Sequence, residues 1–205
     1  MPASTEKILS TLAKTGLLLK QDKMLPNVVT LVTGESLKGS WWSHPKSHEI
    51  FAILMELADH PDVLICKLLG GKDTLVHRKL WPVLLAVARE DAPWQTRGLS
   101  APARRLLAQA RDAKEPLPAS GPAVMELQRR LLLHAEEIHT PSGKHALAVE
   151  TWQAWARRKK LKPLASPEKV RAQLEAAART LGAPISALPW TDTQLPARIR
   201  RKIEA

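Results

Sequence analysis

Apolar residues recur at helical spacing through the N-terminal half of the chain, except in two short apolar runs. The helices predicted from this spacing cover residues 4–15, 46–58 and 78–89. Residues 25–32 are also predicted to form a short helix, although their valines favour a strand. The runs 63–69 and 74–77 are rich in strand formers, and Gly70–Asp73 between them is typical of a hairpin turn.

The C-terminal half has a helical pattern and is rich in Arg and Ala. The helices predicted there cover residues 100–112, 121–139, 144–160, 167–181 and 194–203. Residues 113–122 interrupt the apolar pattern with prolines, which is typical of a linker. The chain is therefore expected to hold two regions, 1–98 and 99–205, or one continuous domain. No repeat of fixed period is visible.

Three helices followed by a hairpin is the order of a winged-helix unit, in which one helix enters the major groove and the hairpin flanks it. On this hypothesis, residues 46–58 form the recognition helix and Gly70–Asp73 the tip of the wing. A generic helical domain with an incidental hairpin fits the pattern equally well. In either case the predicted fold class is mainly α, helical with one winged-helix-like β-hairpin in the N-terminal half.

The charge of the chain favours a polyanionic partner. The formal net charge is +11 and the isoelectric point is about 10.1. Residues 1–98 carry 12 Lys and Arg against 10 Asp and Glu, whereas residues 99–205 carry 19 against 10. The C-terminal region is therefore expected to clamp phosphates, and the N-terminal region to read bases or to catalyse. A plainer interpretation is that the charge only keeps an Arg-rich protein soluble.

The compartment is predicted from what the sequence lacks. A single cysteine, Cys66, excludes an internal disulfide and fits a reducing compartment, and its apolar neighbours suggest a buried, inert thiol. No apolar run approaches the roughly 20 residues that span a bilayer, and the N-terminus lacks a secretory pattern. A cytoplasmic protein without membrane association is expected.

Residues 39–81 concentrate the side chains that carry chemistry, with four of the seven histidines and three of the seven tryptophans. A base-excision enzyme needs an aromatic or apolar pocket for an extruded base and a reactive group near the sugar. The catalytic candidates are His77, Lys72 and Lys67, a lysine serving if the reaction passes through a Schiff base. The nucleic-acid-binding candidates are Trp41, Trp42, His44, Arg78, Lys79, Arg157, Arg158, Lys159 and Lys160. For each residue alone, a structural role is the plainer interpretation.

Two histidine groups raise the question of a metal. His134, His139 and His145 lie close together in the sequence, and on a helix Glu137 would orient His134 at i,i+3. Their spacing does not match His-Glu-x-x-His or another established motif. The pair of His44 and His48 straddles a predicted helix start and has no further ligand nearby. No metal site is assigned, and no cofactor is expected.

Two segments, Gly-Ser-Trp-Trp-x-His-Pro at 39–45 and Thr-Leu-Val-His-Arg-x-Leu-Trp-Pro at 74–82, resemble a group of bacterial proteins. The likeness extends from Leu17 to Trp155. No activity is attached to that group, so the resemblance implies no catalytic role.

The sequence therefore predicts a DNA-binding protein, and its sharpest version is a base-excision glycosylase or lyase. Whether it is an enzyme stays open. One alternative is a non-enzymatic winged-helix protein of transcriptional or architectural type. Another is a metal-dependent hydrolase built on His134, His139 and His145. DNA is favoured over RNA as the partner, and no oligomeric state is predicted.

Overall fold

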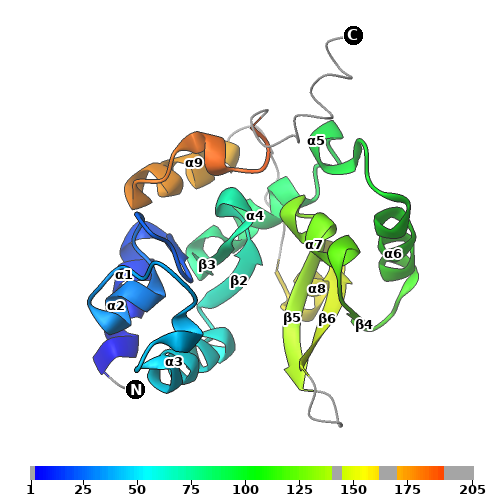
Figure 1. Cartoon of the computed structure of the whole chain (residues 1–205). Helices are drawn as coiled ribbons and strands as arrows, with labels where there is room; N and C mark the ends of the chain where they lie inside the picture. The colour runs from blue at the N-terminus through cyan, green and yellow to red at the C-terminus, as the bar shows by residue number, and fades with distance from the viewer. Residues whose placement is uncertain (1–2, 140–144, 162–169, 192–205) are drawn as a thin grey trace.

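Two small antiparallel sheets, each flanked by helices, make up the structure (Figure 1). The computed structural model describes residues 3–139, 145–161 and 170–191. We call residues 3–88 the first unit and the described residues from 101 to 158 the second unit. The short helix α5 (Pro93–Thr96) lies between the units, and α9 (Val170–Leu181) follows the second unit.

The first unit is built around a sheet with strand order β1-β3-β2. Its helices and strands are α1 (Ala3–Thr15), β1 (Leu17–Leu19), α2 (Val28–Thr33), α3 (Ser47–Asp59), β2 (Val63–Lys67), β3 (Asp73–His77) and α4 (Trp81–Ala88). Single 3-10 turns are η1 (Trp41–Ser43), η2 (Leu69–Gly71) and η3 (Arg78–Leu80). The third strand is central because β3 pairs antiparallel with both others, so Val76 lies between Leu17 and Leu64.

Local signals explain where these elements begin and end. The Asn27 side chain accepts the Thr30 N–H and caps α2, and Gly34 ends that helix in a left-handed conformation. Gly16 turns the chain from α1 into β1 with φ of 79°. A Cβ at Gly16 would lie 2.8 Å from Leu80 Cδ1, so both the turn and the close packing require glycine.

The second unit repeats this order with one helix fewer. Its elements are α6 (Ala101–Asp112), β4 (Leu117–Ala119), α7 (Pro122–Arg129), β5 (Leu133–His139), β6 (His145–Thr151) and α8 (Trp152–Arg158). The strand order is β4-β6-β5, so the last strand of the unit is again central. Three residues separate α3 from β2, and three separate α7 from β5. Both units therefore place a helix, a hairpin and a following helix in the same succession.

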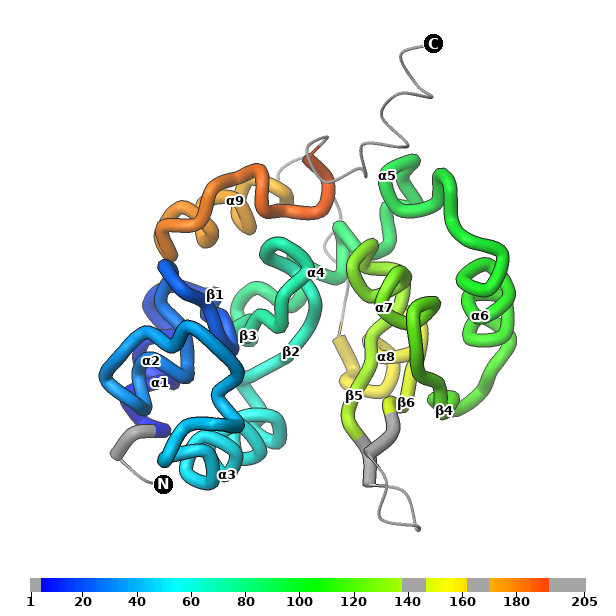
Figure 2. The backbone as a smooth tube through the Cα atoms, viewed as in Figure 1, coloured from blue at the N-terminus to red at the C-terminus, as the bar shows by residue number. Residues whose placement is uncertain are grey.

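The two units share part of one hydrophobic core. Leu131, Trp152 and Trp155 from the second unit join the core of the first, and Trp155 meets Trp81 of α4 edge to face at 5.5 Å. A smaller core lies between α6, α7 and one face of the second sheet. Helix α9 closes the first unit, packing on α1, β1 and α4, as the tube in Figure 2 shows.

The predicted fold class, mainly α with one hairpin, is wrong, because the structure is mixed α and β with two three-stranded antiparallel sheets. The helix at 46–58, the hairpin between 63 and 77 and the short helix within 25–32 are confirmed, with small shifts of their ends. The helices predicted at 121–139 and 144–160 are each half wrong. Only α7 and α8 are helical there, while β5 and β6 occupy the remainder.

Two further differences concern the C-terminal half. Strand β4 lies inside the segment predicted as a linker, where Pro118 is tolerated because β4 is an edge strand. The helix predicted at 194–203 lies outside the described residues.

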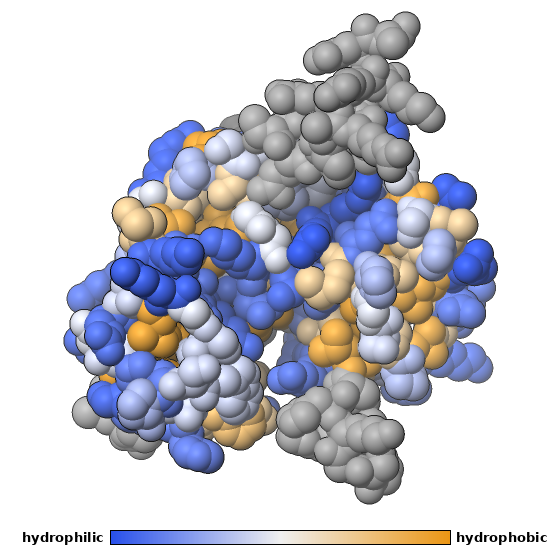
Figure 3. All heavy atoms as spheres, in the orientation of Figure 1, coloured by the Kyte–Doolittle hydropathy of each residue, from blue (hydrophilic) through white to orange (hydrophobic). Residues whose placement is uncertain are grey.

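Hydrophilic residues cover much of the face shown in Figure 3, while hydrophobic residues gather over the sheet of the second unit. Leu117, Ala119, Ala135 and Leu147 of that sheet are only half-buried.

Among the described residues, no helix is both long enough and apolar enough to cross a membrane.

Candidate functional site

The second sheet has one apolar face and one polar face. Residues alternate between faces along a strand, so Leu133 and Val149 point into the smaller core. His134, Glu136 and Glu150 lie on the other face, and the register places His134 directly opposite Glu150. Helix α8 follows β6 immediately and covers this face with Trp152, Trp155 and Arg158.

His134 is buried between aromatic rings and carboxylates. Its side chain is only 2% exposed, and the rings of Trp152 and Trp155 lie 5.2 and 5.4 Å from the imidazole. Burial is the main reason why the pKa of His134 falls to about 4, although Glu136 acts in the opposite direction. The imidazole is therefore neutral at physiological pH.

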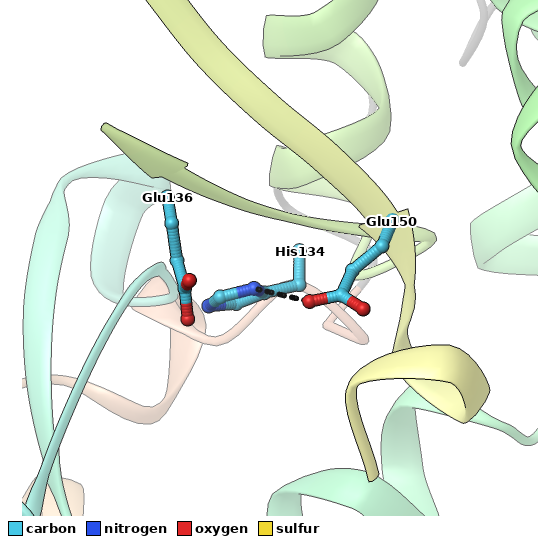
Figure 4. A group of neighbouring side chains, drawn as sticks. All are labelled: His134, Glu136 and Glu150. Atoms are coloured by element: carbon cyan, nitrogen blue, oxygen red, sulfur yellow. Dashed lines mark ion pairs between the residues drawn. The ribbon is translucent and has the colours of Figure 1, made fainter. Parts of the chain in front are cut away.

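One nitrogen of this imidazole has no hydrogen-bond partner. Nδ1 of His134 is buried and lies 3.9 Å from Oε1 of Glu150, beyond hydrogen-bond distance. Figure 4 shows the ring between the carboxylates of Glu136 and Glu150. The indole nitrogens of Trp152 and Trp155 are also buried without a partner. Such groups are rare in folded proteins and call for an explanation.

Arg158 connects the two carboxylates. Its guanidinium donates to Oε1 of Glu150 through both Nε and Nη2, and Nη2 also lies 3.1 Å from Oε1 of Glu136. The hydrogen bond with Glu150 is the largest cause of the raised pKa of Arg158. The ligand-type atoms of His134, Glu136 and Glu150 all lie within 4.8 Å of one another. The group therefore has the donors of a cation site, and Arg158 supplies a positive charge to it.

A hollow of about 390 Å³ opens beside this group, between the end of α6 and α8. Glu150 and Arg158 line it, together with Lys114 from the segment after α6 and Arg157 from α8. Arg157 and the next two lysines of the chain, Lys159 and Lys160, are exposed. Within the described part of the chain, no ion pair involves Lys114, Arg157, Lys159 or Lys160. Among the predicted phosphate-binding residues of this segment, Arg158 alone is bound to acids.

The predicted catalytic residues lie near the hairpin of the first unit but not together. The ammonium of Lys67 lies 2.6 Å from Asp73, and that of Lys72 lies 2.5 Å from Asp22. His77 stands at the other end of β3, where its Nδ1 accepts the N–H of Lys79. Burial is the main cause that lowers the pKa of His77. These contacts are those of a stabilised hairpin and a capped helix start.

The tip of this hairpin is also covered. Turn η2 packs near η4 (Ile185–Ala187), and a Cβ at Gly71 would lie 3.1 Å from the Arg129 side chain of α7. The predicted wing tip is therefore in contact with the rest of the protein. Cys66 of β2 is buried, as expected, and burial raises the pKa of its thiol.

The tryptophans predicted to bind nucleic acid differ in exposure. Trp41 and Trp42 stack at 4.0 Å, but Trp41 is buried and Trp42 is 61% exposed. Trp42 also contacts Phe51 of α3. Of the two, only Trp42 therefore has a ring face available to a partner.

The basic candidates beside them have partners within the first unit. His44 pairs with Glu35 at 3.2 Å, and Arg78 with Asp62 at 3.6 Å. Lys79 donates to the carbonyl of Ala13 at the end of α1.

The histidines predicted as one cluster are separated by the strand geometry. His139 pairs in register with His145 at the far end of the β5–β6 ladder, five residues from His134. At the rise of an extended strand this separation is roughly 16 Å. The structure instead brings His134 to Glu136 and Glu150, which the sequence interpretation missed. A strand assignment for 133–139 would have placed His134 and Glu136 on one face, since they are two residues apart.

Comparison of the chain with protein-family models, with curated proteins and with solved structures finds no match. The function is therefore inferred from the geometry and charge described above.

Proposed function

We propose that this protein binds duplex DNA through the basic end of α8 and acts by contact, without base excision. The observation that carries the proposal is that Arg157, Lys159 and Lys160 are exposed and form no ion pair with any described residue. Lys114 faces the same hollow as Arg157. Cations that are not already neutralised are those that gain most from phosphate contact, because they release counterions from the DNA.

The hairpin and α3 of the first unit form a poorer phosphate surface than the end of α8. Lys20 and Lys67 share Asp73, and Lys72 is bound to Asp22. On α3, which corresponds to the expected recognition helix, the exposed residues include the acids Glu49 and Asp59. Carboxylates on that helix repel the DNA backbone, so we assign the phosphate contacts to the second unit.

The order of elements supports the same class of function by fold-level analogy. A helix, a strand, two helices and then a hairpin, with the last strand central, is the order of winged-helix units. This order occurs in the first unit, whereas the second unit has a single helix between its first strand and its hairpin. The analogy raises the expectation of DNA binding but does not select the surface, which is chosen here by charge.

The base-excision version of the function has less support. A lysine that forms a Schiff base must attack as a free, neutral amine. The ammonium groups of Lys67 and Lys72 are both held by carboxylates, and His77 is committed to capping η3. The same residues are explained by their structural contacts, so contact alone is the function that we propose.

The test compares two triple variants that change the net charge equally. Arg157, Lys159 and Lys160 are replaced by Gln in one variant, and Lys7, Lys14 and Lys23 of the first unit in the other. Binding to a fluorescent duplex is measured by anisotropy across a salt series, in the presence of a chelator. The α8 variant should bind at least about tenfold more weakly, and its log–log salt slope should fall by roughly 0.9 for each phosphate that the protein no longer neutralises.

The control variant should bind almost as tightly as the wild type, because only the long-range field of the protein changes. Equal losses of affinity in both variants would mean that total charge, not the α8 surface, drives binding. Parallel titrations with single-stranded DNA and with an RNA duplex identify the preferred nucleic acid. Tighter binding to RNA than to DNA would overturn the assignment of the partner.

A further inference from the structure

We propose that the polar face of the second sheet binds one divalent transition-metal ion through His134, Glu136 and Glu150, in competition with Arg158. Its ligands are not among the residues proposed to contact DNA, although Lys114 and Arg157 line the hollow beside it. In the sequence, His134 is a metal candidate only together with His139 and His145, because Glu136 and Glu150 join it only when residues 133–139 and 145–151 pair as strands.

The donor set is suited to such an ion. An imidazole nitrogen and two carboxylate oxygens bind Zn²⁺, Co²⁺ or Mn²⁺, and three protein ligands leave a position for water. The ligand atoms lie within 4.8 Å of one another. They must close to roughly 3.3 Å for a tetrahedral ion with bonds of about 2.0 Å. Glu136, whose side chain is 42% exposed, has the freedom to make this movement.

The imidazole supplies an independent indication of a ligand. Nδ1 of His134 has no partner although the residue is almost fully buried, and it is directed at the carboxylate of Glu150. A buried imidazole that served only the core would satisfy this nitrogen with a carbonyl or a hydroxyl group.

The guanidinium of Arg158 lies where the metal ion is proposed to bind. Its Nη2 contacts Glu136 Oε1 and Glu150 Oε1 together, and Glu150 Oε1 is the atom that faces His134 Nδ1. The charge of a divalent ion among these atoms would balance that of the two carboxylates, so Arg158 would no longer be needed there. Arg158 is the last residue of α8 and lines the open hollow, as does Glu150. The hollow is therefore both a route for the ion and a space for the displaced guanidinium.

The experiment titrates Co²⁺ into the full-length, chelator-treated protein and follows the visible absorption of bound cobalt. Quenching of tryptophan fluorescence is a second readout, since Trp152 and Trp155 flank His134. One ion per chain is expected. Glu136→Gln should weaken binding at least tenfold, because the ion has one ligand fewer. Arg158→Gln should strengthen binding about tenfold, because the competing cation is removed.

Glu137→Gln is the matched control, since Glu137 neighbours Glu136 on β5 but belongs to the opposite face of the sheet. It should bind cobalt as the wild type does. The melting temperature provides a check on folding: Arg158→Gln leaves Glu150 unpaired, and Zn²⁺ should raise its melting temperature more than that of the wild type. Cobalt affinity that is unchanged in Glu136→Gln would place the ion at other histidines and overturn the proposal. Arg158→Gln binding no more tightly than the wild type would overturn the competition.

Discussion

The two units have the same order of strands, yet their sheets differ in what the second face carries. In the first sheet, β1 is fully buried and the central residues of β3 are Thr74, Leu75 and Val76, all buried. In the second sheet, one face is apolar and the other carries His134, Glu136 and Glu150. Stability alone is served by the first arrangement, since polar groups are costly to bury. The second arrangement is the one for which the metal site proposed above gives a reason.

The two units also differ in whether their cations are paired with acids. Around the first hairpin, acids neutralise Lys67, Lys72 and Arg78. At the end of α8, only Arg158 is neutralised, and its neighbours Arg157 and Lys159 have no acid partner among the described residues. Charge surplus in a sequence thus says little about binding until the internal pairs are known, because paired cations are already compensated.

The largest loss of stability is expected from a substitution in the core that the two units share. Trp155→Ala removes a side chain that is 1% exposed and contacts Trp81, Trp152 and His134. It should lower the free energy of unfolding by about 3–5 kcal/mol, as large-to-small core changes do. Urea unfolding followed by circular dichroism measures the decrease. Trp42→Ala, at an exposed ring, is the control and should cost less than about 1 kcal/mol.

A single unfolding transition is expected for the wild type, since residues of both units lie in one core. Two separate transitions would show that the units unfold independently, and the comparison would then concern two domains.

The next largest effect is a loss of stability at acid pH, and its cause is the buried imidazole of His134. His134 has a pKa of about 4 in the folded protein against 6.5 in the unfolded chain, so the unfolded state binds the proton first as pH falls. Stability should therefore decrease between pH 6.5 and 4, by about 3 kcal/mol for this group. Burial is the largest cause of the lowered pKa, Glu136 opposes it, and Arg158 and Lys159 add to it.

His134→Gln should show a shallower decrease of stability over this range, measured by urea unfolding at several pH values. His48→Gln, at an exposed position, serves as the control and should follow the wild type. An undiminished slope in His134→Gln would mean that another group carries the acid sensitivity.

The difference between the units also explains what the sequence revealed. The first hairpin was predictable because Val63–Lys67 is rich in strand formers and Gly70 and Gly71 mark a turn. The second hairpin was not, because Ala135, Glu136 and Glu137 favour helices and tertiary packing overrides that preference. Read as a helix, the segment pairs His134 with Glu137, so the fold error produced the error in the site.

Other features of the site depend on contacts that no local pattern contains. The basic run at 157–160 is obvious in the sequence, but the binding of Arg158 to Glu136 and Glu150 requires three elements to meet. Likewise, nothing near Lys72 indicates its partner Asp22, which lies fifty residues earlier. The sequence therefore shows which residues of both groups are charged, but it does not show which of them are free to bind a partner.

The smallest loss of stability is expected from breaking an ion pair of the first unit, the one between Asp22 and Lys72. Burial alone would raise the pKa of Asp22, but the hydrogen bonds from Lys72, Leu25 and Met24 outweigh it and lower the pKa to about 2. The ionised carboxylate therefore stabilises the fold above pH 3.8, and this contribution is lost as pH falls towards 2. Asp22→Asn should cost about 1 kcal/mol at neutral pH after solvent screening is considered.

Replacing Lys72, the other partner of this ion pair, can be compared with replacing an unpaired lysine of the second unit. Lys72→Gln should also reduce the free energy of unfolding, by up to about 1 kcal/mol, because Asp22 loses an ion pair. Lys160→Gln in the second unit should leave stability unchanged within about 0.5 kcal/mol, since no described residue pairs with Lys160. Urea unfolding at neutral pH measures both. Equal costs would mean that Lys160 also serves folding, and the α8 surface would then not be free for a partner.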